Sequence, residues 1–116
     1  MQKKVIQPLS TALENKPEGH SFTRNRLLIG SESGAKNFSL QHGSILPGGE
    51  AQPHKHNFEQ GIYIISGKAR ISIEAEGTFE VTQDTAVFFP PERTHRIVAL
   101  GAEALKIIVI YAPPPK

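Results

Sequence analysis

The fold is decided by residues 61–82, GIYIISGKARISIEAEGTFEVT. From Ala69 to Ala75 apolar side chains occupy every second position, which is the period of a strand with one buried face. The pairs Ser66-Gly67 and Glu76-Gly77 separate this strand from a β-like run on either side, and both pairs are typical of tight turns. The stretch therefore predicts three consecutive antiparallel strands.

Similar short runs, punctuated by Gly and Pro, occur on both sides of this stretch. The further predicted strands are residues 26–29, 36–46, 85–89, 94–99 and 104–111. The only helical candidate is a short segment from Leu9 to Asn15. So many short strands predict an all-β sandwich or barrel, an architecture that by itself implies no function.

Composition narrows the range of functions. The 116 residues suffice for one domain with one core, and 13 Lys and Arg against 11 Asp and Glu give a net charge of only +2. The basic residues are scattered, so no nucleic-acid partner is expected. The absence of cysteine excludes disulfides and thiolate catalysis. The chain shows neither a secretory signal nor a membrane-spanning run, and we expect a soluble, cytoplasmic protein.

Two predicted strands depart from alternation. Residues 105–111 (LKIIVIY) are apolar except for Lys106, and residues 27–29 (LLI) are apolar throughout. Both faces of such strands are expected to contact protein. We expect a second subunit of a homodimer to cover the outer face of these strands, and an N-terminal segment is the alternative.

The strongest candidates for metal-binding residues are His54 and His56. Separated by one residue, their imidazoles project from the same face of a strand and can converge on one ion. His95 follows a proline turn at the start of a distant predicted strand and can complete a three-nitrogen set for a transition metal. Alone, the H-x-H pattern also fits two surface histidines near a turn.

At this point the sequence resembles the cupins. Their first motif is matched throughout by Gly48, five residues, His54-Lys55-His56, three residues, Gln60, six residues and Gly67. Their second motif is matched only in part. Pro90 and His95 fall in place, whereas the two glycines and the asparagine are replaced by Asp84, Glu92 and Ala99.

The resemblance implies a double-stranded β-helix, the cupin jelly roll, over residues 22–113. Residues 1–21 would form an N-terminal arm and residues 114–116 a C-terminal tail. It also implies a single divalent transition metal ion (Fe, Mn, Ni, Cu or Zn) inside the barrel. Carried over by position, the ligands are His54, His56, Gln60 and His95.

Strand parity supports Gln60 rather than Glu59 as the fourth ligand. Gln60, Ile62 and Ile64 share one face of their strand, whereas Glu59 and Tyr63 point to the other. A glutamine contributes no negative charge, so the ion would be a stronger Lewis acid and would attract an anionic ligand.

The remaining site candidates are weaker. The substrate pocket is predicted to include Gln41, Ile62, Ile107, Val109 and Tyr111. Ordinary core is the alternative for the apolar residues, and a surface amide is the alternative for Gln41. His42 is expected to face away from the metal, and His20, in the turn-like stretch PEGHSF, is expected to be exposed.

Three hypotheses on function follow. The first is a metal-dependent enzyme of the dioxygenase or isomerase type, acting on a small oxygenated or anionic molecule. The second is a metal-containing module or sensor that binds a small molecule, such as a sugar, without turnover. The third is a cupin scaffold whose histidines hold no ion.

Overall fold

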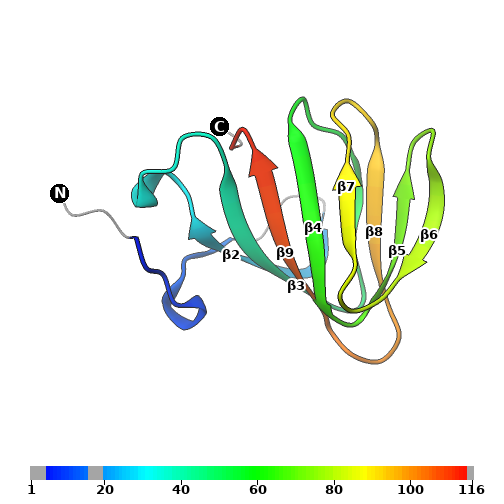
Figure 1. Ribbon diagram of the computed structural model, residues 1–116. Coiled ribbons are helices and arrows are strands. Elements are labelled where there is room, and N and C mark those ends of the chain that lie inside the picture. The colour runs from blue at the N-terminus through cyan, green and yellow to red at the C-terminus, as the bar shows by residue number, and fades with distance from the viewer. Residues whose placement is uncertain (1–4, 16–19, 115–116) are drawn as a thin grey trace.

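The computed structural model describes residues 5–15 and 20–114, which form one curled antiparallel sheet (Figure 1). No α-helix occurs within these residues, and the all-β prediction is confirmed. The strands are β1 (Glu14–Asn15), β2 (His20–Ile29), β3 (Ser39–His54), β4 (Glu59–Ser66), β5 (Lys68–Ile73), β6 (Gly77–Val81), β7 (Ala86–Phe89), β8 (His95–Leu100) and β9 (Leu105–Ala112).

The helix predicted from Leu9 to Asn15 is wrong. Only a single 3₁₀ turn forms, at Leu9–Thr11, and Glu14 and Asn15 pair with β2 instead. A helix this short is marginal in water because few hydrogen bonds offset the cost of nucleation. None of the helical segments in the described ranges is long and apolar enough to cross a membrane.

The long strand β3 joins the two layers of the sheet. The strand order is β6-β5-β8-β3-β9-β4-β7, and β2 lies along the other edge of β3. The first half of β3 pairs with β9 and its last residues pair with β8. Figure 1 shows the resulting curl, in which β9, β4 and β7 follow on one side of β3 and β8, β5 and β6 on the other.

β3 bends at Pro47-Gly48-Gly49 but does not end there. The strand predicted to end at residue 46 therefore continues further, because the backbone keeps strand pairing on both sides of the bend. Gly48 has a φ of +84°, which favours glycine. A Cβ on Gly49 would lie 2.5 Å from the carbonyl oxygen of Ser21, so glycine is needed for β2 to approach here.

Alternating apolar residues fill the space between the walls. In β5, Ala69, Ile71 and Ile73 are buried and the residues between them are more exposed, as the sequence predicts. Ile64 and Ile71 are fully buried, and each such side chain contributes about 1.5–3 kcal/mol through burial. The histidines border this core, since Phe89 belongs to it and its ring lies 4.4 Å from that of His95.

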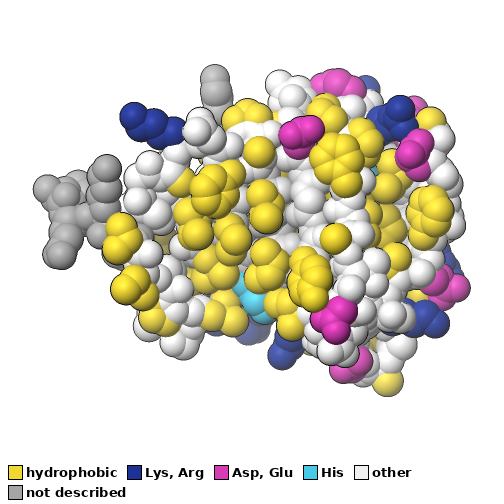
Figure 2. Space-filling model, viewed as in Figure 1, with side chains coloured by type: hydrophobic (Ala, Val, Ile, Leu, Met, Phe, Trp, Pro, Cys, Tyr) yellow, Lys and Arg dark blue, Asp and Glu magenta, His cyan; other side chains and the backbone are white. Residues whose placement is uncertain are grey.

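The outer face of the β9–β4–β7 wall is apolar (Figure 2). The strand register places Ile110 beside Gly61 and Gly61 beside Phe88, while Ile108 lies beside Tyr63. Tyr63, Phe88 and Ile110 are 44%, 54% and 41% exposed. We refer to Tyr63, Phe88, Ile108 and Ile110 as the outer apolar face. The expected two-sided apolar character of β9 is therefore observed.

Candidate metal centre

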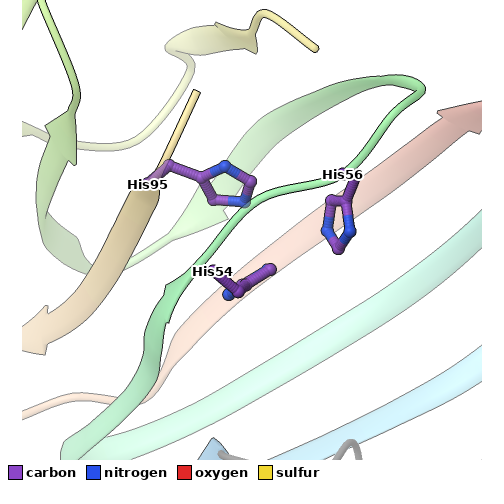
Figure 3. A group of neighbouring side chains, drawn as sticks. All are labelled: His54, His56 and His95. Carbon is purple, nitrogen blue, oxygen red and sulfur yellow. The ribbon is translucent and has the colours of Figure 1, made fainter. Parts of the chain in front are cut away.

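Three histidines converge where β3 and β8 meet (Figure 3). His54 ends β3, His56 follows it in the loop to β4, and His95 begins β8 directly opposite His54 in the strand register. The imidazole centroid of His54 lies 4.7 Å from that of His56 and 4.4 Å from that of His95. The sequence prediction that these three side chains come together is confirmed.

The spacing of the three imidazoles suits one ion. One ring nitrogen from each of His54, His56 and His95 can be chosen so that all lie within 4.8 Å of one another. Nitrogens bound to one tetrahedral ion at about 2.0–2.1 Å lie about 3.4 Å apart. The rings of the three histidines would therefore have to rotate toward one another for their nitrogens to bind one ion.

The buried polar atoms at the centre support this interpretation. His56 Nε2, His95 Nε2 and Gln60 Oε1 are all buried without a hydrogen-bond partner. Gln60 is only 4% exposed and shares the inward face of β4 with Ile62 and Ile64, as predicted. Each buried polar atom without a partner lowers the stability of the fold by about 1–3 kcal/mol, a penalty that coordination of an ion would remove. The residues present therefore fit a metal ion.

Aromatic side chains hold two of the imidazoles in place. The ring of His56 stacks on Phe58 at a centroid distance of 4.5 Å and an angle of 10°. The ring of Phe89 lies 4.4 Å from that of His95. His95 Nδ1 lies 3.4 Å from the carbonyl oxygen of Arg93, to which it donates when Nδ1 is protonated, and this leaves Nε2 as the nitrogen that could bind a metal.

Burial keeps these imidazoles neutral. Burial, followed by the nearby His54 ring, lowers the pKa of His95 from 6.5 to about 4. The same two causes, in the same order, lower the pKa of His56. Because only a neutral imidazole binds a metal, both side chains are in the ligating form at neutral pH.

A small cavity lies beside the histidines. It encloses about 20 Å³, the space of about one water molecule. Ile107, Val109 and Tyr111 line it, together with His54 and Gln60. No aspartate or glutamate is found among the described residues of its lining.

The other two predicted pocket residues lie nearby. Ile62 is 3% exposed and belongs to the hydrophobic core. Gln41 lies on β3, where its Oε1 accepts a hydrogen bond of 3.4 Å from Asn25 Nδ2, and Asn25 lines the cavity. Burial raises the pKa of Tyr111, so its phenol stays protonated at neutral pH.

The prediction that His20 is exposed is wrong. It begins β2, where it pairs with Ala51 of β3, and it is half-buried. Its ring centroid lies 5.5 Å from that of His54, and burial and the His54 and His56 imidazoles lower its pKa. Extending the strand predicted from Arg26 back to His20 would have found it, but nothing in HSFTRN marks where the strand begins. Phe58 and Phe89 were also missed.

The comparison with family models identifies the class of protein. Residues 41–111, more than half of the chain, match the model of the cupin domain. Together with the curled antiparallel sheet and the three histidines at its end, this match shows that the chain belongs to the cupin family.

Two curated proteins are similar over part of their length. The chain is 31% identical over 77 residues to an uncharacterised protein of Methanocaldococcus jannaschii, covering 66% of this chain and 61% of that protein. It is 34% identical over 79 residues to mannose-1-phosphate guanylyltransferase RfbM of Salmonella typhimurium, covering 66% of this chain and 16% of that protein. The chain thus spans less than two thirds of each relative.

Solved structures share the fold more fully. The polyketide cyclase RemF of Streptomyces resistomycificus is 26% identical, with a TM-score of 0.83 over 97% of this chain and 80% of that one. An RmlC-like cupin of Shewanella frigidimarina is 16% identical, with a TM-score of 0.78 over 93% and 89%. Bacillus subtilis oxalate decarboxylase, which has Mn(II) centres, is 20% identical, with a TM-score of 0.80 over 97% and 30%. The last two show the fold alone.

Proposed function

We propose that the protein is a metal-dependent enzyme that binds a small oxygenated or anionic substrate at a centre formed by His54, His56, Gln60 and His95. The observation that carries the proposal is the set of orphaned buried atoms on His56, His95 and Gln60. The ion would be a divalent transition metal (Fe, Mn, Ni, Cu or Zn), because three imidazoles and one amide oxygen suit these ions better than calcium or magnesium.

The charge of the centre favours an anionic ligand. All four proposed ligands are neutral, and no carboxylate is present in the described lining of the cavity. A buried divalent ion without an opposing charge is costly, and an oxyanion bound beside it lowers that cost. Such an ion would supply Lewis acidity toward a coordinated carbonyl or carboxylate oxygen. The Tyr111 phenol, kept protonated by burial, would offer a hydrogen bond to the same ligand.

The small cavity constrains how a substrate binds. About 20 Å³ accommodates an ion or one water molecule but no organic molecule. The substrate would therefore place only its coordinating oxygen inside and keep its remaining atoms toward the open end. Likeness to a polyketide cyclase over most of both chains supports an enzyme over a binding module.

Metal binding is tested by elemental analysis of protein purified without an affinity tag. We expect one ion per chain, or uptake of one ion on titration. His95→Ala should weaken binding strongly, whereas His42→Ala should not, because His42 lies on the outward face of β3 beside Ile108. Equal effects of the two substitutions, or no uptake by the wild type, would contradict the proposed centre.

Turnover is tested with the metal-loaded protein and a panel of keto-acids, diketones and keto-sugars. Product formed by the wild type but not by His95→Ala supports an enzyme. Saturable binding without any product would instead assign the protein to the second hypothesis, a binding module.

We also propose that a second copy of the chain covers the outer apolar face. None of these four side chains is charged, and they lie on neighbouring strands, so this face can pack against itself about a two-fold axis. Phe88→Asp, at a side chain that is 54% exposed, should give a folded monomer in sedimentation velocity, whereas the wild type should be a dimer. A monomeric wild type would refute this assembly.

A further inference from the structure

β2 brings three polar side chains into the cavity beside the candidate metal centre: His20, Thr23 and Asn25. Two of them have partners within the protein. Thr23 Oγ1 donates to the carbonyl oxygen of Ser21 at 2.9 Å, and Asn25 Nδ2 donates to Gln41 Oε1 at 3.4 Å. His20 differs from both, because its Nδ1 is buried and has no hydrogen-bond partner.

His20 lies beside the centre and not within it. Its ring is tilted by 39° to that of His54, at a centroid distance of 5.5 Å. It does not belong to the compact group of His54, His56 and His95, whose ligand atoms all approach one another within 4.8 Å. From this position at the border of the group, its imidazole can contact a ligand that the ion holds.

His20 also lines a second, larger space. This open hollow of about 620 Å³ is lined as well by Phe22, Thr23, Arg24 and Leu46. His20 and Thr23 therefore border both the small cavity and the hollow. A molecule that enters from the hollow and reaches the centre with one oxygen would pass the imidazole of His20.

We propose that His20 is a ligand-binding residue whose Nδ1–H donates a hydrogen bond to the second oxygen of a carboxylate or enediolate ligand. This inference rests on the proposed metal centre. Such a ligand has one oxygen for the ion and another that needs a donor. A buried imidazole nitrogen without a partner supplies that donor, and the bond removes the cost of leaving Nδ1 unsatisfied.

The proposal also predicts which substitutions of His20 are tolerated. The side-chain amide nitrogen of asparagine lies about where Nδ1 lies in histidine, so His20→Asn keeps a donor in place. The amide of glutamine lies one bond further from the backbone, so His20→Gln moves the donor away. Leucine fills much of the same volume and has no donor. The surface substitution His42→Leu is the matched control.

The test uses Co²⁺ as a coloured stand-in for the ion and acetate as the simplest carboxylate probe. Co²⁺ affinity is measured first from the visible absorption bands, and acetate is then titrated into each Co²⁺-loaded variant. We expect all variants to bind Co²⁺ as the wild type does. His20→Leu and His20→Gln should weaken acetate binding about tenfold, the effect of one charge-assisted hydrogen bond. His20→Asn and His42→Leu should leave it near the wild-type value.

Each contrary result has a distinct meaning. Unchanged acetate affinity in His20→Leu and His20→Gln would overturn the role of His20 while leaving the metal centre intact. Loss of Co²⁺ binding in these variants would also overturn it, because His20 would then be a metal ligand. Failure of the wild type to bind Co²⁺ would refute the centre itself. If the leucine variant does not fold, the comparison of His20→Asn with His20→Gln decides the matter alone.

Discussion

Acid should destabilise the metal-free protein through His95. The His95 side chain is 2% exposed, and its pKa in the folded state is about 4, compared with 6.5 in an unfolded chain. Between these two values the unfolded chain binds a proton at this residue that the folded protein does not. The free energy of unfolding therefore falls as the pH falls from 6.5 toward 4, by about 1.4 kcal/mol per pH unit from this residue alone.

The magnitude is large compared with the usual stability of a domain. Across the window of pH 6.5 to about 4, His95 accounts for about 3 kcal/mol, where a whole domain typically has about 5–15 kcal/mol. The lowered pKa values of His20 and His56 act in the same direction, so the wild-type slope should exceed that of a single proton.

The assay is urea unfolding followed by circular dichroism, in the presence of a chelator, at several pH values across this window. His95→Leu keeps most of the buried volume but removes the titrating group. Its free energy of unfolding should depend on pH less steeply than that of the wild type, by about one proton. Equal slopes for the two proteins would refute the assignment of a buried, neutral imidazole at position 95.

Three further predictions concern the fourth ligand, the bend of β3 and the core. Gln60→Glu should retain the ion but weaken acetate binding, because it adds a negative charge beside the ion. Glu59→Gln, on the outward face of β4, should change neither metal binding nor acetate binding. The reverse result in metal and acetate titrations would assign the fourth ligand to Glu59 instead of Gln60. Gly49→Ala should lower the free energy of unfolding by about 2 kcal/mol or more, because its Cβ would lie 2.5 Å from the carbonyl oxygen of Ser21 in β2. Gly48 has open space around it, so Gly48→Ala should lower the free energy of unfolding only by the backbone strain, about 1–2 kcal/mol. A smaller effect at Gly49 than at Gly48 in urea unfolding would contradict the close approach. Ile71→Ala should cost about 2–5 kcal/mol because Ile71 is fully buried, and a loss below about 1 kcal/mol would place this side chain outside the core.

The features that the sequence predicted well depend on local periodicity. The alternation around Ile71 and the inward parity of Gln60 are set by neighbouring residues in one strand, so they can be read without knowing what the strand packs against. The spacing from Gly48 to Gly67, together with His95, likewise brought His54, His56 and His95 into one site. The role of Gln60 as a ligand stays a prediction.

The features that it missed depend on contacts between distant segments. β3 continues through Pro47-Gly48-Gly49 because β2 pairs with it on both sides of the bend, and no local signal reports that pairing. His20 enters the site for the same reason, since its position opposite Ala51 follows from the register of β2 and β3. Phe58 was missed because stacking on His56 depends on how the loop between β3 and β4 turns.

The continuity of β3 also bears on how the chain can be divided. One end of this strand, at Ser39, pairs with β9, and the other end, at His54, pairs with β8. A break at the bend near Gly48 would separate residues 39–45 from β9, while the segment from Glu50 to His54 would stay with β8. The three histidines would all remain on the second fragment, whose β9 would lack its bordering strand. Metal uptake by this fragment alone, compared with uptake by the two fragments together, would therefore report how far the histidine cluster depends on an unbroken β3.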